Sequence, residues 1–286
     1  MVDRSRQPGR GGPRRGRPAP PARGRGEGRQ GRGGGRSIGG EQVEGRQAVR
    51  ELLVAGRRAV RDVWLAAGQD EAPILSEIAR SAEARHVPLH VVTRARLAAT
   101  AQTEAPQGVV ARAAPLPEAE LAQLAARRDG GPPPFVVVLD GVTDPHNLGA
   151  LLRTAECAGA TGAVLPRHRS AMVTPAVAKA AAGAIEYLPL AVVAGIPAAL
   201  ATLAAAGVWT VGLDGSSPER LWDLDLADQP VALVLGAEGR GLSRLVRERC
   251  DQLRAIPQRG VISSLNVAAA AALACFEVAR RRDPPA

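Results

Sequence analysis

The stretch "VVVLDGVTDPHNLGALLRTAE", residues 136–156, joins an apolar run to a helix through a short polar loop. The continuous Val and Leu residues predict a strand at 135–140 that is buried on both faces, as the strands of parallel sheets are. Asp144 or Asn147 can cap the helix that follows, because both residue types are favoured at helix N-termini. Loops on a rigid scaffold often carry function, so this loop is the first candidate site.

Outward from this stretch, the alternation of strand and helix patterns continues to the C-terminus. Further strands are predicted at 162–165, 186–193, 208–213, 230–236 and 252–257, with a last helix at 264–282. Since these strands are continuous apolar runs, we expect an α/β domain whose parallel sheet is covered by helices on both faces. Ligands bind beyond the carboxyl ends of the strands in such sheets, so the segments that follow the strands are the candidate sites.

A glycine-rich segment, "GAEGRG" at 236–241, follows the strand at 230–236. Glycine lets the backbone approach a ligand closely. The spacing G-x-x-G-x-G differs from both the dinucleotide fingerprint and the Walker loop. A plain turn is the alternative interpretation, but Glu238, set among glycines directly after a buried strand, favours a binding role.

The third strand end leads through "IPQRGVISSLN", residues 256–266, into the last helix. Ser263 or Ser264 can cap that helix. Asn266 is expected in its first turn, where exposed N–H groups and the helix dipole favour negatively charged groups. The alanine run that follows, 268–272, allows close helix packing and indicates a core or a subunit interface.

Arg153 suits the recognition of phosphate, because its planar guanidinium binds oxygens in pairs. Asn147 and Arg153 lie six residues apart, which is about 240° around a continuous helix. We expect the two side chains to converge if Asn147 lies in the entry loop and Arg153 reaches back over the first turn. The alternative is that Asn147 only caps the helix and that Arg153 only pairs with Glu156.

Residues 41–113 carry a shorter α/β pattern. Helices are predicted within 45–56 and at 72–84, and strands at 62–67, 88–93 and 107–113. No catalytic cluster stands out there, and the isolated His86 and His90 are expected at the surface or at a sheet edge. Residues 114–134 have prolines at both ends of a short polar helix, which predicts a linker before a domain at 135–286.

Residues 1–40 contain eleven arginines against Asp3 and Glu27, so they carry the whole net charge of +9. Their Gly, Arg and Pro composition predicts a disordered tail, because it offers almost nothing to bury. Such a tail attracts phosphate through a salt-sensitive term that is independent of sequence; a solubility tail is the alternative. Aromatic residues make up only 2% of the chain, which argues against single-strand binding by base stacking.

Cys157, Cys250 and Cys275 show no C-x-x-C spacing, so we expect neither a zinc site nor a disulfide framework. We expect them to be small buried residues in a reducing cytoplasm. The basic N-terminus has no apolar segment behind it, unlike a signal peptide, and the apolar stretch at 267–276 is too short to span a bilayer. These features predict a cytoplasmic protein that binds neither membrane nor metal.

The three loops together resemble the SpoU-type RNA ribose 2′-O-methyltransferases of the SPOUT superfamily. The matching stretches agree in order and spacing over 135–282; they are "LDGVTDPHNLGALLRTAECAGA", "LVLGAEGRGLS" and "IPQRGVISSLNVAAAAAL". The front region, with "EGRQAVRELL" and "APQGVVA", is similar to the L30e-like RNA-binding domain of many members, although Pro106 precedes Gln107 where many relatives have His. The most similar subgroup methylates a guanosine ribose in 23S ribosomal RNA.

This resemblance implies a fold that hydrophobic periodicity does not predict. The C-terminal domain is expected to form a deep trefoil knot, an exception to the rule that chains avoid threading. S-adenosylmethionine is expected to bind in a bent conformation in the knotted loops, at a homodimer interface. The resemblance implies that its contacts are Gly236, Ile256 and Leu265, and that the reactive-site residues are Asn147, Arg153, Glu238, Ser264 and Asn266.

The implied reaction transfers a methyl group from a sulfonium to a ribose 2′-oxygen, so the protein mainly has to align the reacting atoms. The weakly acidic hydroxyl needs a proton acceptor as attack proceeds. Because arginine stays protonated, we expect Arg153 to hold the hydroxyl and an adjacent phosphate, with the phosphate receiving the proton. Glu238 is expected to orient the site or to accept the proton, and His146 is a titratable neighbour with a structural role.

Three other functions remain open at this point. The substrate can be transfer RNA instead of ribosomal RNA, because the sequence does not name the methylated nucleotide. A non-catalytic RNA-binding protein would not need Asn147, Arg153 and Glu238 together. A nicotinamide-dependent enzyme would need the glycine fingerprint and the acidic residue after it, which the sequence lacks.

Overall fold

The computed structural model describes residues 38–69, 72–127, 129–168, 170–226, 228–262 and 264–283. All but the last three residues of the predicted tail at 1–40 lie outside these ranges. The described chain forms two β-sheets, one of six strands and one of four. None of its helices is long and apolar enough to cross a membrane.

The six-stranded sheet is entirely parallel, with the strand order β10-β8-β9-β5-β6-β7. Its strands are β5 (Phe135–Asp140), β6 (Gly162–Pro166), β7 (Leu190–Val193), β8 (Trp209–Leu213), β9 (Val231–Gly236) and β10 (Gln252–Arg254). The two central strands, β5 and β9, are buried over all but their last residue. The parallel sheet predicted from continuous apolar runs is therefore confirmed.

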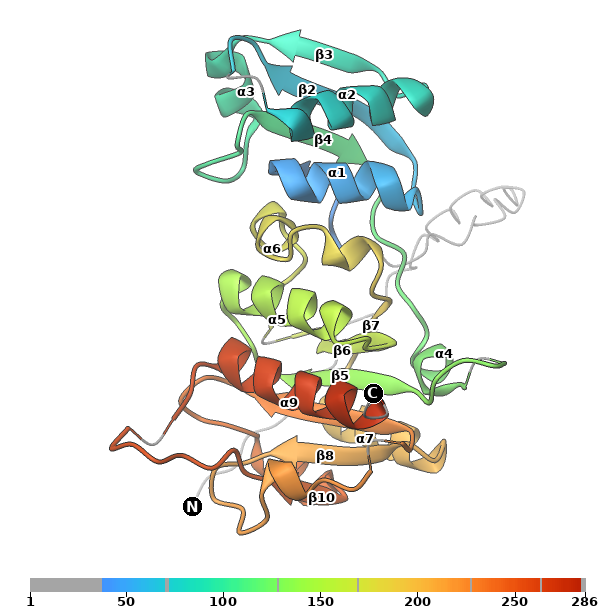
Figure 1. The fold of residues 1–286 in the computed structure, drawn as a ribbon, viewed down its shortest axis with the longest axis vertical. Helices are drawn as coiled ribbons and strands as arrows, with labels where there is room; N and C mark the ends of the chain where they lie inside the picture. The colour runs from blue at the N-terminus through green and yellow to red at the C-terminus, as the bar shows by residue number, and fades with distance from the viewer. Residues whose placement is uncertain are drawn as a thin grey trace, which may run out of the picture. The chain divides into compact units, whose positions relative to one another are not determined.

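Helices cover both faces of this sheet, because alternate residues of each strand point to opposite sides. Phe135, Val137 and Leu139 enter one core, together with α5 (Pro145–Cys157), α6 (Pro175–Ala180) and α9 (Val267–Arg282). Val136 and Val138 enter the other, together with α4 (Leu121–Ala125), α7 (Ile196–Ala205) and α8 (Arg244–Arg249). On the first face, α5 and α9 run side by side (Figure 1).

Two predicted strands are shorter than expected. The strand predicted at 186–193 begins only at Leu190, because Ala184–Glu186 form a 3₁₀ turn, η1. The strand predicted at 252–257 ends at Arg254. Beyond it, Ala255 exchanges backbone hydrogen bonds with Glu219 and Leu221, next to a second 3₁₀ turn, η2 (Leu221–Asp223).

The four-stranded front sheet has the order β1-β4-β2-β3, in which only β2 and β3 are parallel. Its strands are β1 (Gln42–Glu44), β2 (Val60–Ala66), β3 (Leu89–Val92) and β4 (Val109–Ala113). Helices α1 (Arg46–Ala55) and α2 (Pro73–Ala84) pack on one face and α3 (Arg94–Thr100) on the other. β1 and α3 are not anticipated by hydrophobic periodicity, since β1 has three residues and α3 buries only Leu97.

The segment predicted as a linker, 114–134, packs against the larger sheet. Leu116 enters the core under α5, and Leu124 enters the opposite core. Helix α4 starts with a reciprocal capping box between Glu120 and Gln123. This segment is therefore part of the packed structure and does not act as a free spacer.

A buried ion pair joins the front region to the larger sheet. The side chains of Arg58, which precedes β2, and Glu186 of η1 are 2% and 1% exposed. The Arg58 guanidinium donates to both Glu186 carboxylate oxygens, at 3.0 and 2.6 Å, and to the carbonyls of Gly40 and Ala114. Because each charge has its partner, the desolvation cost of burial is offset only while both residues are present.

We predict that Arg58→Leu lowers the free energy of unfolding by roughly 3–5 kcal/mol, since it leaves the Glu186 carboxylate buried without its partner. The double variant Arg58→Leu/Glu186→Leu is expected to recover part of this loss. Urea unfolding of the two variants and the wild type measures the difference. A double variant as unstable as Arg58→Leu would contradict the interpretation.

Candidate active site

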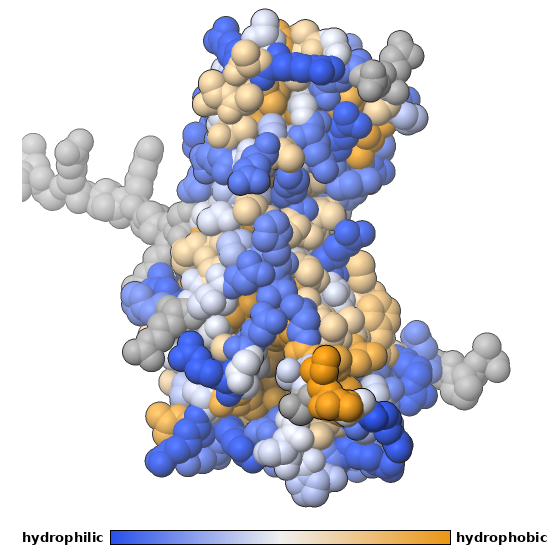
Figure 2. Space-filling model, turned by 90° about the vertical axis from the view of Figure 1, so that its left-hand side faces the viewer, coloured by the Kyte–Doolittle hydropathy of each residue, from blue (hydrophilic) through white to orange (hydrophobic). Residues whose placement is uncertain are grey.

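A cleft opens at the carboxyl end of the parallel sheet, where sequence analysis placed the candidate loops. It is lined by the segments that follow β8, β9 and β10 and by the entry to α9. Gly236, Ile256 and Leu265, the three implied cofactor contacts, all line it, and so does Ser264. On the side of the molecule shown in Figure 2, apolar side chains stand out beside polar ones. Val261, Ile262 and Leu265 are exposed large apolar residues at the entry to α9.

Beside this cleft, side chains from three separate segments that follow strand ends form a line of hydrogen bonds. The Asn266 Nδ2 group donates to Asn147 Oδ1 at 3.0 Å. The Asn147 Nδ2 group donates in turn to Glu238 Oε2 at 3.0 Å. The sheet therefore brings together residues that lie more than ninety positions apart in sequence.

The direction of this line is set by helix α9. Asn266 is its N-cap, and Asn266 Oδ1 accepts hydrogen bonds from the amides of Ala268 and Ala269 at 2.9 and 3.3 Å. Because the oxygen faces the helix, the Nδ2 group faces Asn147 and requires an acceptor there. Asn147 must then present its own Nδ2 group to Glu238, which as a carboxylate can only accept. Sequence analysis assigned the cap to Ser263 or Ser264, which is wrong, because Asn266 occupies that position.

Asn147 was expected in the loop before α5, from where its side chain could meet that of Arg153. In the structure the helix already begins at Pro145. Asp144 is its cap and accepts hydrogen bonds from the amides of His146 and Asn147, at 3.2 and 3.1 Å. Pro145 takes the first helical position, where its missing N–H costs nothing. Asn147 is therefore helical, and its side chain points away from that of Arg153, about 240° around the helix.

The loop that carries Glu238 is a tight turn closed by two backbone hydrogen bonds between Ala237 and Gly241, at 3.0 and 2.8 Å. Gly239 and Gly241 have positive φ angles of 76° and 65°, which only glycine adopts without strain. Ser243 donates its amide to Asp140 at 2.7 Å and so ties the end of the turn to β5. The turn holds Glu238 exposed and facing α5.

Gly236 forms part of the cleft with backbone alone. A Cβ atom at this position would lie 2.0 Å from the carbonyl carbon of Gly241 and 2.3 Å from the amide nitrogen of Leu242. Backbone atoms cannot move aside as a flexible side chain can, so no other residue fits. The turn at 236–241 therefore requires glycine at this position.

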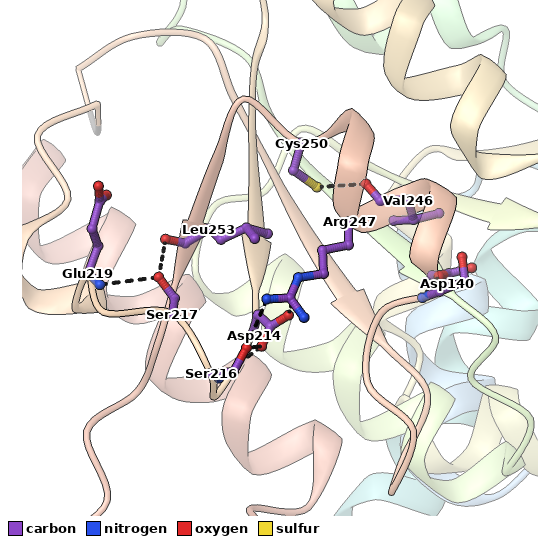
Figure 3. A network of polar contacts seen from close by, with 10 residues as sticks. Asp140, Asp214, Ser216, Ser217, Glu219, Val246, Arg247, Cys250 and Leu253 are labelled. Atoms are coloured by element: carbon purple, nitrogen blue, oxygen red, sulfur yellow. Dashed lines mark hydrogen bonds and ion pairs between the residues drawn. The ribbon is translucent and has the colours of Figure 1, made fainter.

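A carboxylate forms another part of the cleft wall. Asp214, directly after β8, accepts from the amide and the hydroxyl of Ser216 at 2.9 and 2.7 Å and pairs with Arg247 of α8 at 3.1 Å. Arg247 also donates to the Ser216 hydroxyl, and Ser217 donates to the carbonyl of Leu253 (Figure 3). Partial burial raises the pKa of Asp214, but the Ser216 hydrogen bonds and the Arg247 charge outweigh it and hold that pKa below its usual value. Asp214 therefore stays ionised in the cleft wall, paired with Arg247.

Similarity to known proteins identifies the family of this chain. Residues 134–276 match the model of the SpoU rRNA Methylase family, and residues 42–119 match RNA 2′-O ribose methyltransferase substrate binding. The chain is 41% identical over 245 residues to a 23S rRNA (guanosine-2′-O-)-methyltransferase, RlmB, of Pseudomonas putida, covering 85% of this chain and 97% of that protein. The chain belongs to the SpoU rRNA methylase family.

Solved structures of SpoU proteins share the fold. The SpoU methyltransferase AviRb from Streptomyces viridochromogenes, in complex with AdoMet, is 27% identical, with a TM-score of 0.69 over 84% of this chain and 90% of that one. An AdoMet-bound rRNA methyltransferase from Sinorhizobium meliloti is 26% identical, with a TM-score of 0.69 over 84% and 87% of the two chains.

In this SpoU family chain, Arg153 lies apart from the other implied reactive-site residues. It is exposed on α5 and does not line the cleft; it lines a separate hollow with Gln47 and Lys179. It makes no ion pair with Glu156 or with any other carboxylate that the structure describes. Neither convergence with Asn147 within the subunit nor pairing with Glu156 is present.

Two residues around the cleft of this SpoU protein were not predicted from the sequence. Asp214 follows the carboxyl end of β8, so the rule that ligands bind at strand ends could have identified it. Arg247 carried no such signal, because it reaches Asp214 from a helix on the opposite core.

Of the cysteines, Cys275 is buried as expected and burial raises its pKa to about 12, whereas Cys157 is exposed. No group of three or more described His, Cys, Asp or Glu residues could hold a metal ion.

We predict that Gly236→Ala lowers the free energy of unfolding by roughly 1–3 kcal/mol, because the added methyl overpacks against fixed backbone. Gly215→Ala is the matched control, since Gly215 lines the same cleft and a Cβ there meets no atom within 4 Å. Urea unfolding compares the two variants. Equal stability for both would show that the turn at 236–241 can open without cost.

Proposed function

We propose that this protein transfers a methyl group from S-adenosylmethionine to the ribose 2′-oxygen of a guanosine in 23S ribosomal RNA. The hydrogen bonds that join Asn266, Asn147 and Glu238 beside the cleft carry the proposal, because they align three polar groups from three strand ends. Similarity to 23S rRNA guanosine methyltransferases over 85% of the chain supports the substrate. Transfer RNA as substrate and a non-catalytic role are the less favoured alternatives. A ribosomal RNA substrate implies a cytoplasmic location.

S-adenosylmethionine fits the cleft that Gly236, Ile256 and Leu265 line. When bound, it supplies a methyl group on a positively charged sulfur that leaves readily. Gly236 lines this cleft with main-chain atoms alone. The Asp214 carboxylate suits a ligand with hydroxyl and ammonium groups, since a carboxylate only accepts hydrogen bonds.

Glu238 is positioned to meet the ribose. One of its carboxylate oxygens accepts from Asn147, while the other accepts no hydrogen bond from the described residues. That second oxygen can accept the hydrogen bond of a ribose 2′-hydroxyl and hold it in line for methyl transfer. Ser264, which lines the cleft, can donate its hydroxyl to an RNA phosphate. His146 is exposed and has no part in this arrangement beyond its amide bond to Asp144.

The role of Arg153 as a holder of the ribose hydroxyl and an adjacent phosphate requires a second subunit. Arg153 lies away from the cleft of its own subunit, so it can serve only a cleft that another copy of the chain supplies. A homodimer through α5 and α9 offers such a cleft. Ala269, Leu273 and Phe276 form an exposed stripe on α9 at helical spacing, and Leu273 and Phe276 are 42% and 51% exposed.

The domain organisation and the knot are further parts of the proposal. Residues 41–113 would form the L30e-like RNA-binding domain, which the substrate-binding match over 42–119 supports. Residues 135–286 would form the knotted methyltransferase domain. β10 lies at the sheet edge, yet α9, which follows it, packs on α5 and on the inner strand β9. This crossing of the chain supports a trefoil knot. The RNA-attracting role of the tail, at 1–40, stays a prediction.

We predict that Arg153→Ala lowers methylation of unmodified 23S rRNA by more than about 100-fold, the lower range for a lost transition-state contact, while S-adenosylmethionine still binds. Glu238→Gln is expected to behave alike. A heterodimer with one Arg153→Ala subunit and one Glu238→Gln subunit, purified through two tags, is expected to recover about half of the wild-type activity, because one of its two symmetric sites is intact. Tritiated methyl incorporation measures this. An inactive heterodimer would place Arg153 in the site of its own subunit.

We predict that Phe276→Glu/Leu273→Glu converts a dimer into a monomer, since two carboxylates on the α9 stripe cannot be desolvated without a partner. Light scattering coupled to size exclusion measures the mass of each form. A wild-type protein that is monomeric at micromolar concentration would contradict the homodimer.

A further inference from the structure

A second concave surface surrounds the first turn of α1, away from the cofactor cleft. It consists of three adjoining hollows that share lining residues: Arg46 is common to the first two, and Gln47 and Gln107 to the last two. The first hollow reaches Arg94 at the start of α3, and the last reaches Lys179 and Arg153. We call this surface the basic groove and define it by Arg46, Gln47, Arg94, Gln107, Arg153 and Lys179.

The cations of the basic groove are not paired with carboxylates. No carboxylate lines the three hollows, although Glu51 and Glu156 line a further hollow that shares Gln47 and Arg153 with the last of them. Its four cations take part in no ion pair with the residues that the structure describes. Arg50, on another side of α1, is by contrast paired with both Glu51 and Glu77. Uncompensated positive charge in a concave surface attracts an anionic ligand.

Neutral contacts hold three of these four cations in place. Arg46 donates from Nε to the carbonyl of Gln107 at 3.1 Å, and its amide donates to the Gln107 side chain at 3.0 Å. Arg94 donates to the carbonyl of Gly68, and Lys179 donates to the carbonyl of Ala105. These bonds fix the side chains without cancelling their charges, so a bound anion would not have to order them first.

The lining also indicates which part of a nucleic acid would bind. The groove contains no aromatic side chain on which a base could stack. Arginine forks and glutamine amides instead match phosphate and sugar oxygens. The groove also runs from the front sheet to α5 and α6 of the methyltransferase sheet, so one strand of RNA could contact both.

We propose that the basic groove binds the phosphodiester backbone of the RNA substrate and leads it from the front sheet to Arg153. This inference rests on the proposed function, because it assigns a path to the same RNA. Contacts of this kind position a nucleic acid without reading its sequence. The groove therefore contributes affinity that is strong at low salt and equal for different structured RNAs.

The first test is Gln47→Glu, which places a carboxylate in the groove with almost no change of shape. Gln47 is exposed in the first turn of α1, where an acidic residue favours the helix and offsets the repulsion from Glu51 four positions on, so the change in stability is expected to be small. Binding to unmodified 23S rRNA and to an unrelated transfer RNA transcript is measured by filter retention. Both affinities are expected to fall roughly threefold to tenfold. Gln229→Glu, an exposed position outside the groove, is the matched control.

The second test is Arg46→Ala/Lys179→Ala, with Arg80→Ala on α2 as the control that lines no hollow of the groove. The slope of the logarithm of affinity against the logarithm of salt is expected to shrink by about 1.5 for two lost phosphate contacts. Calorimetry with S-adenosylmethionine confirms that the variant is folded. Groove variants that bind RNA like their controls, next to a wild type that methylates 23S rRNA, would overturn the groove alone. A wild type that fails to methylate 23S rRNA would overturn the proposed function itself.

Discussion

The orientation of one carboxamide governs the polar geometry of the site. The Asn266 oxygen is held by two backbone amides at the start of α9, and every hydrogen bond from there to Glu238 follows from that choice. Asn147 cannot reverse its amide without facing a donor to a donor and an acceptor to an acceptor. The parallel sheet supplies the other half of this constraint, because only strands that end at one edge can bring the three loops within hydrogen-bonding distance.

Much of this fold could be predicted from the sequence because its central strands are buried on both faces. β5 and β9 consist of continuous apolar residues, so their pattern is unambiguous. β1 and α3 escape such analysis, since each is short and buries few side chains. The strand predicted at 186–193 includes Glu186, whose burial depends on Arg58, a residue 128 positions away. Local patterns cannot register a pairing of that kind.

The sequence predicted which residues form the candidate site better than it predicted how they are arranged. Loops at strand ends identified Asn147, Glu238 and Asn266, which the structure joins. The cap of α9 was misassigned because serine and asparagine have nearly equal preference for that position. Arg153 shows the limit most clearly: helical spacing alone places it on another side of α5, and its proposed part in the reaction depends on a second chain. A single sequence gives no direct information about subunit contacts.

Asn266 has two separate roles: its oxygen caps α9, and its nitrogen donates a hydrogen bond to Asn147. An aspartate would accept the amides of Ala268 and Ala269 equally well, and helix N-termini accommodate either residue. The helix would thus tolerate the exchange, yet an oxygen would then face Asn147 where a nitrogen now donates. Selection for a well-folded protein alone would leave this position free to drift between the two residues. The helix cap alone therefore does not explain an asparagine at this position, whereas the hydrogen bond donated to Asn147 does.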